Sequence, residues 1–427
     1  MEGEAPLAAV PTARQVPRWS ELREIVQFRR PQLGRTARRL QNALTIRDLR
    51  AAARKTTPRA VFDYVDGAAE EEITAARNVA AYRRIAFRPD ALRPVAEPET
   101  AVELLGRRLA MPLVFGPTGY TRMMHHHGES AVARVAQHVG VPYALSTVGS
   151  TSIEDVRVAA PEADLWFQVY YTSNQALNEM LVDRAEEQGY STLVLTIDTS
   201  VSGMRLRDVV NGLTIPPALT AKTFLNMSRF PGWWFNKLTT PVIGFASLDE
   251  VEGKPTPGQV ANMLFDPGLD FTSLDWLRRR WTGPLLVKGV TNPASAREIM
   301  ARGADGVVVS NHGGRQLDRT PATLDVLPAV RAAVGPEATV LVDGGVLHGQ
   351  DIVAARALGA DAVMIGRAYL YGIMAGGQDG VLRAYRILAD EYQRSMQLLG
   401  VRRSVDLAER HVAFSPHGTG DHPDVAT

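Results

Sequence analysis

Eight short apolar runs, separated by segments with a helical spacing of apolar residues, constrain the fold of this chain more than any other feature. Each run is apolar on both faces of the strand it would form, so both faces have to be covered. Eight such strands alternating with helices predict an α/β fold, either a (β/α)8 TIM barrel or a doubly wound sheet. We expect the barrel, because there are eight runs and polar residues recur at their ends. The predicted strands are 112–116, 143–147, 165–170, 192–198, 285–290, 306–311, 339–344 and 362–366.

Segments outside the strand–helix rhythm lie at both ends of the chain. Residues 1–43 form a basic, Pro- and Arg-rich N-terminal arm. A helical extension follows, in which Thr45 and Asp48 form an acidic variant of the capping box. We expect the barrel to span residues 44–412 and a C-terminal tail to span residues 413–427.

The connection between the fourth and fifth predicted strands, residues 199–284, is far longer than a usual βα loop. It is rich in Pro, Trp and Phe, and Phe224 and Trp233 are examples. We expect an insertion that serves as a lid over the barrel or packs between subunits. A segment that dips into a membrane surface is the close alternative.

Composition narrows the chemistry and the location. The 427 residues include no cysteine, which excludes disulfides, thiolate nucleophiles and cysteine-bound metals. The net charge of +1 gives no case for nucleic acid as a partner. No apolar run reaches the roughly 18 residues that a membrane-spanning helix needs, and no secretory leader is recognisable. We expect a cytoplasmic protein, or one that lies peripherally on the inner face of the cell membrane.

Charge is distributed unevenly along the chain. Residues 1–55 hold 12 Arg or Lys against 5 Asp or Glu. A basic arm of this kind can contact anionic lipid, a partner or the chain's own body. Contact with a membrane surface is therefore one of the partners we expect.

The loop 310–318, with the sequence Ser-Asn-His-Gly-Gly-Arg-Gln-Leu-Asp, follows the sixth predicted strand. It places His312 and Arg315 three residues apart. A His can move a proton near neutral pH, and an Arg can bind a carboxylate through two parallel hydrogen bonds. The pair suits an acid whose neighbouring carbon loses hydrogen. A surface loop with a chance His and Arg is the alternative for this loop alone.

Polar residues at the ends of the other strands argue against chance, because the carboxyl ends of barrel strands meet on one face. Two ends are Gly-rich turns, 343–345 and 366–367, which suit a phosphate. Lys288 could stabilise an anion beside a ring that accepts a hydride, or merely pair with a carboxylate inside the barrel. The pattern indicates a flat phosphorylated cofactor across the barrel mouth. The polar strand-end residues are Thr118, Ser146, Gln168, Tyr170, Thr196, Asp198, Lys288, His312, Arg315, Asp343 and Arg367.

The loop 310–318 resembles the signature of the FMN-dependent α-hydroxy acid dehydrogenase and oxidase family. Further matches follow in family order over roughly residues 45–412. They are Phe62-Asp-Tyr64, Pro117-Thr118, Leu145-Ser146, Phe167-Gln-Val-Tyr170, Leu195-Thr-Ile-Asp198, Gly203-Met-Arg205, Val287-Lys-Gly289, Asp343-Gly-Gly345 and Ile365-Gly-Arg367. The segments 27–31 and 233–234 look most like bacterial quinone-linked L-lactate dehydrogenases.

This resemblance implies a role for each strand-end residue. His312 would be the catalytic base, Asp198 would hold its imidazole, and Lys288 would stabilise the reduced flavin. Tyr170 would hydrogen-bond the substrate oxygen and complete the catalytic set. The residues implied to bind substrate are Tyr64, Tyr170, Arg205 and Arg315. The residues implied to hold FMN are Thr118, Gly119, Ser146, Gln168, Thr196, Lys288, Ser310, Asp343, Gly344, Gly345, Gly366 and Arg367.

The same resemblance implies a reaction and its partners. We expect oxidation of an (S)-2-hydroxy acid, namely of L-lactate to pyruvate. The electrons would pass to a quinone or other acceptor. The enzyme would be a homo-oligomer, specifically a tetramer. One alternative is an oxidase that uses O2 and takes glycolate, lactate or a mandelate-like acid. An FMN-dependent isomerase and a non-catalytic, membrane-associated flavoprotein are the others.

Four positions depart from the family pattern. Leu347 stands where many members carry an Arg, so Arg367 or another residue has to supply the missing phosphate ligand. Gly119 stands where many oxidases carry Ala, which weakens the O2 alternative. Val148 replaces a bulky aromatic residue and Leu206 replaces a Glu, so the expected pocket differs in size and polarity and the identity of the acid stays open.

A run of three histidines, His125-His126-His127, could suggest a metal site. Family members keep a His and a Gly-Glu pair in this loop, matching His125 and Gly128-Glu129. We therefore expect no metal.

Overall fold

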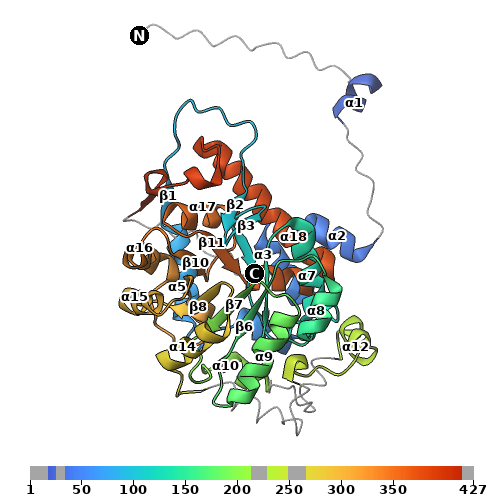
Figure 1. The fold of residues 1–427 in the computed structure, drawn as a ribbon. Coiled ribbons are helices and arrows are strands. Elements are labelled where there is room, and N and C mark those ends of the chain that lie inside the picture. Colours follow the sequence, from blue (N-terminus) through green and yellow to red (C-terminus); the bar gives the residue numbers. More distant parts are fainter. Residues whose placement is uncertain (1–17, 26–33, 213–227, 249–265, 416–427) are drawn as a thin grey trace, which may run out of the picture.

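A closed barrel of eight parallel strands forms the body of the protein (Figure 1). The computed structural model describes residues 18–25, 34–212, 228–248 and 266–415. The strands pair in the order β10-β11-β4-β5-β6-β7-β8-β9, and every predicted strand is present, so the predicted (β/α)8 barrel is confirmed. These strands are β4 (Leu113–Phe115), β5 (Tyr143–Ser146), β6 (Leu165–Val169), β7 (Thr192–Thr196), β8 (Leu285–Val290), β9 (Gly306–Val309), β10 (Thr339–Asp343) and β11 (Ala362–Ile365).

Helices that follow the strands surround the barrel. Register places polar strand-end residues side by side, because Ser146 of β5 pairs with Gln168 of β6 and Thr196 of β7 pairs with Lys288 of β8. Each pair therefore lies side by side near the carboxyl ends of the strands. The helices are α6 (Thr121–Met124), α7 (Gly128–Val139), α8 (Ile153–Ala159), α9 (Gln175–Glu187), α14 (Phe271–Arg280), α15 (Pro293–Ala301), α16 (Thr323–Val334), α17 (Gly349–Ala357) and α18 (Arg367–Leu399).

The inside of the barrel is a packed apolar core that is closed at its N-terminal end. Trp166 of β6 is 1% exposed and packs in one cluster with inward residues of the other strands. The hairpin of β2 (Val102–Leu104) and β3 (Arg107–Leu109) adds Val102, Leu104 and Leu109 to the same cluster. Because this end is filled, a ligand site in the barrel has to lie at the carboxyl ends of the strands.

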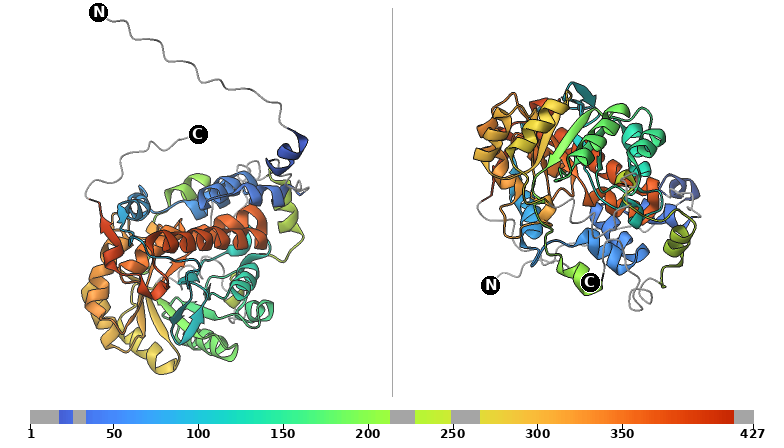
Figure 2. Two further views of the ribbon diagram at one scale, coloured as in Figure 1. Left: turned by 90° about the horizontal axis from the view of Figure 1, so that it is seen from above. Right: turned by 60° about the horizontal axis from the view of Figure 1, so that its bottom comes forward.

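The N-terminal extension packs against the last helix of the barrel. The helices α2 (Arg35–Asn42) and α3 (Ile46–Thr56) contact α18, and Figure 2 shows the blue helices lying along the red one. The predicted capping box is present at the start of α3, where the Asp48 backbone N–H donates to Thr45 Oγ1 at 3.1 Å. The remaining N-terminal elements are α1 (Trp19–Ile25), α4 (Arg59–Asp66), α5 (Ile73–Arg83) and β1 (Ile85–Phe87), which pairs antiparallel with β12 (Val412–Phe414). Two 3-10 turns, η3 (Ser404–Asp406) and η4 (Glu409–His411), precede β12.

The long connection after β7 contains α10 (Leu206–Asn211), α12 (Pro231–Leu238), the 3-10 turn η1 (Ala246–Leu248) and α14. The indole of Trp233 donates to the carbonyl of Met123 at 3.0 Å, which fixes α12 to α6. Phe224 lies outside the described residues, as do most of the N-terminal arm and residues 416–427 of the tail. Among the described helices, none combines the length and apolar character that crossing a bilayer requires.

Candidate active site

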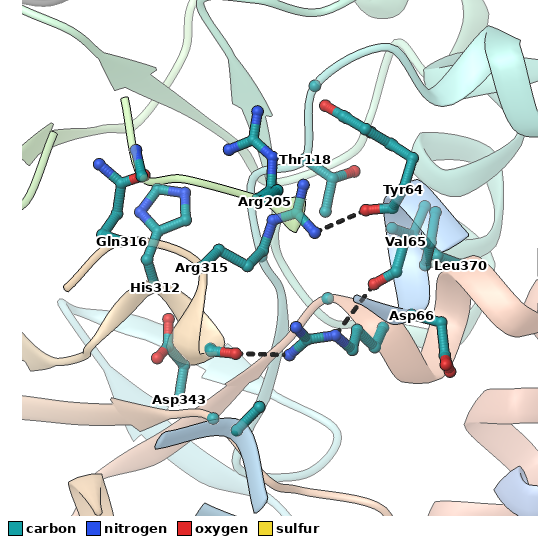
Figure 3. A pocket seen from close by; sticks show the side chains of 18 of the residues that line it. Tyr64, Val65, Asp66, Thr118, Arg205, His312, Arg315, Gln316, Asp343 and Leu370 are labelled. Atoms are coloured by element: carbon teal, nitrogen blue, oxygen red, sulfur yellow. Dashed lines mark hydrogen bonds between the residues drawn. The ribbon is translucent and has the colours of Figure 1, made fainter. Parts of the chain in front are cut away.

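The carboxyl ends of the barrel strands open into a cavity of about 1380 Å³ (Figure 3). Helices α3, α4 and α5 form one side of it, and the loop after β7 forms part of the other. Gln168, Thr196, Asp198 and Ser310 lie behind the residues that line it. The predicted site residues that line the cavity are Tyr64, Thr118, Gly119, Ser146, Tyr170, Arg205, Lys288, His312, Arg315, Asp343, Gly344, Gly345, Gly366 and Arg367.

His312 is held at the cavity wall in an unusual backbone conformation. It opens the 3-10 turn η2 (His312–Gly314) with φ of 56°, a region that residues other than glycine seldom adopt. Its ring Nδ1 lies 2.9 Å from Oδ1 of Asp198. Nε2 is therefore the ring nitrogen that remains for a ligand in the cavity.

Asp198 is placed to hold a negative charge behind His312. Burial would raise the pKa of its carboxyl group, but the positive charges of His312 and Lys288 and the hydrogen bond from His312 hold that pKa below its ordinary value. Gly289 makes the room, because a Cβ at that position would lie 2.8 Å from Cβ of Asp198. An ionised carboxylate in this position orients the imidazole and stabilises its protonated form.

Two arginines and a tyrosine form a cationic wall beside His312. The guanidinium carbon of Arg315 lies 4.9 Å from the ring centre of Tyr64, and that of Arg205 lies 5.9 Å from it. Arg315 donates to the Tyr64 carbonyl at 2.6 Å, and Arg205 donates to Asp208 at 2.9 Å. Burial and the nearby charge of Arg205 lower the pKa of Arg315 to about 10. A carboxylate in the cavity would relieve this repulsion between like charges.

Lys288 carries a buried positive charge on β8. Its Nζ donates to Ser310 Oγ at 2.9 Å and lies 3.1 Å from Oδ2 of Asp343. Burial would lower the pKa of Lys288, but the carboxylates of Asp343 and Asp198 raise it above its ordinary value. The lysine is thus both paired with a carboxylate and exposed to the cavity that it lines.

Several buried polar atoms at the barrel mouth have no hydrogen-bond partner within the described part of the chain. Ser146 Oγ donates to Gln168 Oε1 at 2.8 Å, which leaves Gln168 Nε2 unpaired. Thr196 Oγ1 and Asp343 Oδ1 are also unpaired. Buried polar atoms are normally satisfied, so these atoms indicate a polar ligand that spans the mouth.

A comparison with known proteins decides the family. The model of the FMN-dependent dehydrogenase family matches residues 53–414. The chain belongs to the FMN-dependent dehydrogenase family. It is 47% identical over 93% of its length to a putative L-lactate dehydrogenase of Mycobacterium tuberculosis, covering 96% of that protein. It is 37% identical over 87% of its length to L-lactate dehydrogenase of Yersinia pestis, covering 98% of it. The crystal structure of the monotopic membrane protein (S)-mandelate dehydrogenase superposes with a TM-score of 0.84 at 36% identity, covering 88% of this chain and all of the other.

As a member of this family the protein uses FMN, and its unpaired atoms fit that cofactor. The unpaired donor on Gln168 and the unpaired hydroxyl of Thr196 stand beside Ser146 and Lys288, which line the cavity, so they can bond the polar edge of a flavin ring there. When bound, FMN accepts the two electrons that the substrate loses. A fixed cation at Lys288 stabilises the negative charge that arrives with them.

Other residues that we predict to hold FMN are closely packed, and their role toward FMN stays a prediction. Thr118 Oγ1 lies 2.7 Å from the hydroxyl of Tyr369, which fixes the residue after β4. A Cβ on Gly119 would lie 2.6 Å from Cγ2 of Val148, so this wall of the cavity is already full. Gly344 and Gly345 both have positive φ, 89° and 84°, and a Cβ on Gly345 would lie 2.5 Å from the Asn78 carbonyl. Only glycine fits this turn.

Arg367, which we expect to help hold the phosphate, lines the cavity and also has partners in the backbone. Its guanidinium donates to three backbone carbonyls, those of Val65 at 3.0 Å, Gly313 at 2.8 Å and Gly67 at 2.9 Å, and Figure 3 shows two of these bonds. It therefore ties α4 and the loop after β9 to the start of α18. Its role toward FMN stays a prediction.

Sequence reasoning missed residues that hold the site together. Gln316 Nε2 donates to the carbonyls of Asp198 at 3.0 Å and Val201 at 2.9 Å, which joins the loops after β7 and β9. Asn78 and Asn311 exchange side-chain hydrogen bonds of 2.8 and 3.0 Å. Gln316 stands inside the family loop, so its position could have drawn attention. Nothing in the local pattern around Asn78 indicates its contact.

The three histidines lie outside the cavity residues described above. Their ring nitrogens fall within 4.8 Å of one another, as metal ligands could. Burial and the neighbouring His126 lower the pKa of His125 to about 3, and Lys237 adds a further positive charge nearby. The absence of a metal stays our prediction.

Proposed function

We propose that this protein oxidises an (S)-2-hydroxy acid to the 2-oxo acid. The observation that carries the proposal is the position of the His312–Asp198 pair beside Arg315 and Arg205, because it sets a base next to a carboxylate site. The arginines bind the carboxylate and turn the 2-carbon toward the flavin. The oxidation releases two electrons and two protons: His312 Nε2 takes one proton, and the other would pass to FMN together with the two electrons. Asp198 stabilises the resulting imidazolium. Tyr170 bonds the substrate oxygen.

We propose L-lactate as the substrate and pyruvate as the product. The relatives named L-lactate dehydrogenase in M. tuberculosis and Y. pestis support this choice. The similar structure of (S)-mandelate dehydrogenase makes a larger 2-hydroxy acid the second candidate substrate. Phe245 and Val148 line the cavity with apolar surface, and a small methyl group or a larger side chain could pack there.

We also propose a quinone as the electron acceptor, reached at a membrane surface by a homo-oligomer, a tetramer. Exposed apolar side chains beside the cavity mouth support membrane contact: Val201 is 62%, Met204 59%, Val209 65% and Val210 67% exposed. The solved mandelate dehydrogenase described as monotopic supports it as well. The tetramer rests on the family resemblance alone.

Anaerobic flavin reduction tests the reaction. L-lactate, and then glycolate, L-mandelate and longer (S)-2-hydroxy acids, are added to the yellow holoenzyme without oxygen. If the flavin absorbance at about 450 nm falls fastest with L-lactate, L-lactate is supported as the substrate. If it falls faster with another acid, that acid is the substrate instead. If none of these 2-hydroxy acids reduces the flavin, the proposed reaction is wrong. Admission of air or of a soluble quinone then separates an O2-using oxidase, which reoxidises rapidly in air, from a dehydrogenase.

A further inference from the structure

The cavity continues beyond the strand-end residues to a second region, beside the turn 344–347. Its floor there is the positive-φ turn of Gly344 and Gly345, packed against the α5 backbone at Asn78. Leu347 lines the cavity immediately after this turn. Turns after the seventh and eighth strands are where barrels commonly bind phosphate, so the FMN phosphate belongs at this end.

The residues nearest this turn leave the phosphate short of positive charge. Leu347 offers no charge. Nδ1 of the adjacent His348 lies 3.4 Å from Oε1 of Glu391, so this carboxylate pairs with the imidazole. Arg367 gives three of its five N–H groups to backbone carbonyls. A phosphate dianion is usually bound by guanidinium or ammonium groups as well as by backbone N–H groups.

Two outer helices bring arginines to the same end. On α5 the residues Ala75, Ala76, Val79 and Arg83 line the cavity, and this helical spacing places Arg83 one turn beyond Val79. A Cβ at Gly345 would lie 3.0 Å from the backbone nitrogen of Val79, so this face of α5 starts at the Gly-rich turn.

The face of α3 that lines the cavity carries Arg47, Arg50 and Arg54. Arg50 is bound to Asp66 through a hydrogen bond of 2.8 Å. Arg47 lines the cavity in the first turn of α3, and Leu347 lines the same cavity. Arg54 stands seven residues further along α3, about 10 Å away along the helix axis.

We propose that Arg47 of α3 and Arg83 of α5 bind the phosphate of FMN, in place of a cationic side chain at position 347. Both side chains are exposed at the open edge of the cavity, so they reach the phosphate from the helical extension and not from the barrel strands. The outer helices thereby become part of the cofactor site. The competing explanation is that neither arginine contacts the cofactor.

Flavin binding to the full-length protein separates the two explanations. FMN is removed from the holoenzyme, and FMN or riboflavin, which lacks the phosphate, is titrated back while flavin fluorescence is followed. We expect Arg47→Ala and Arg83→Ala each to raise the Kd for FMN about 10-fold, the effect of losing one charge-assisted contact that is partly exposed. The Kd for riboflavin should change less than about 2-fold. This readout does not depend on any substrate, so it stands apart from the test of the proposed reaction.

Matched controls define the outcome that overturns the proposal. Arg54→Ala removes the same charge from the same helix and cavity, and Arg77→Ala removes one from α5 outside the cavity lining. Both should leave the Kd for FMN unchanged. An equal loss in Arg54→Ala and Arg47→Ala, or an equal loss of riboflavin affinity, would mean general attraction or damage to the fold and would overturn the proposal. An unchanged Kd in the Arg47→Ala/Arg83→Ala double variant would do the same.

A compensating substitution gives a second, independent measurement. Leu347→Arg places a guanidinium on the turn itself. In the Arg47→Ala background it should restore at least half of the lost FMN affinity on a logarithmic scale, while riboflavin affinity stays constant. Failure to restore affinity in a variant that still binds riboflavin normally would show that the Leu347 end does not hold the phosphate.

Discussion

The ring Nδ1 of His312 lies 2.9 Å from the carboxylate Oδ1 of Asp198, although 114 positions separate the two residues in the chain. The contact exists because β7 and β9 flank β8 in the barrel and both release their loops on the same face. It fixes the ring orientation of His312 before any ligand arrives. The consequences of removing either partner are therefore distinct.

Replacement of His312 by Ala removes the base and leaves the flavin site. We expect His312→Ala to retain FMN and to lose flavin reduction by more than about 100-fold, the low end of the contribution of a general base. Anaerobic stopped-flow absorbance measures the rate of flavin reduction. The flavin absorbance at about 450 nm, divided by the protein concentration, measures the FMN content. An unchanged rate would remove His312 from the mechanism.

Replacement of Asp198 by Asn keeps the shape but removes the negative charge behind the ring. We expect Asp198→Asn to slow flavin reduction at least about 100-fold, because the protonated imidazole loses its stabilising partner. Glu at position 198, which restores the charge on a longer side chain, is the comparison. A wild-type rate in Asp198→Asn would contradict the assigned role.

Gly119 and Val148 are coupled by their close packing. A methyl group at position 119 would lie 2.6 Å from Cγ2 of Val148, so Gly119→Ala should cost about 1–3 kcal/mol of unfolding free energy and weaken FMN binding. Val148→Ala in the same chain should recover most of both losses. Urea unfolding of the FMN-bound protein measures the free energy. Gly232→Ala, where a Cβ meets no atom within 4 Å, is the control. Equal destabilisation of both glycine variants would refute the coupling.

Asp351 should make the stability of the protein depend on pH. Its Oδ2 accepts hydrogen bonds from the backbone N–H groups of Leu347 and His348 at 2.8 Å each, and burial raises the pKa of its carboxyl group from 3.8 to about 6. The folded state therefore binds this proton more tightly than the unfolded state. The resulting stability is present below pH 3.8 and is lost as the pH rises through about 6.

The variant Asp351→Asn cannot titrate and shows this dependence by difference. Between roughly pH 4 and pH 7 the native protein should lose up to about 3 kcal/mol relative to Asp351→Asn. Chemical unfolding at a series of pH values measures it. Asp48→Asn removes an equivalent capping-box carboxylate at the exposed start of α3 and should not reproduce the slope. A constant difference between the native protein and Asp351→Asn would rule out the raised pKa.

The sequence is sufficient to predict the barrel and the ring of strand-end residues for a physical reason. A strand buried on both faces has to be apolar throughout, so polar residues can occur only where it ends, and His312 and Lys288 stand out at such ends. The commitment of Arg367 to three carbonyls could not be predicted, because it depends on how α4 packs against the loop after β9. The same holds for Arg47 and Arg83, whose helices carry no local signal of what they face.

The apolar cluster fills the N-terminal end of the barrel, so the cavity opens at the carboxyl ends of the strands. We therefore expect the proposed substrate, its product and the proposed electron acceptor to reach the flavin from this same side. A shared route would order the turnover, because the oxo acid has to leave before the acceptor reaches the reduced flavin. We expect steady-state kinetics of the double-displacement (ping-pong) type, in which the oxo acid product competes with the electron acceptor for the reduced enzyme.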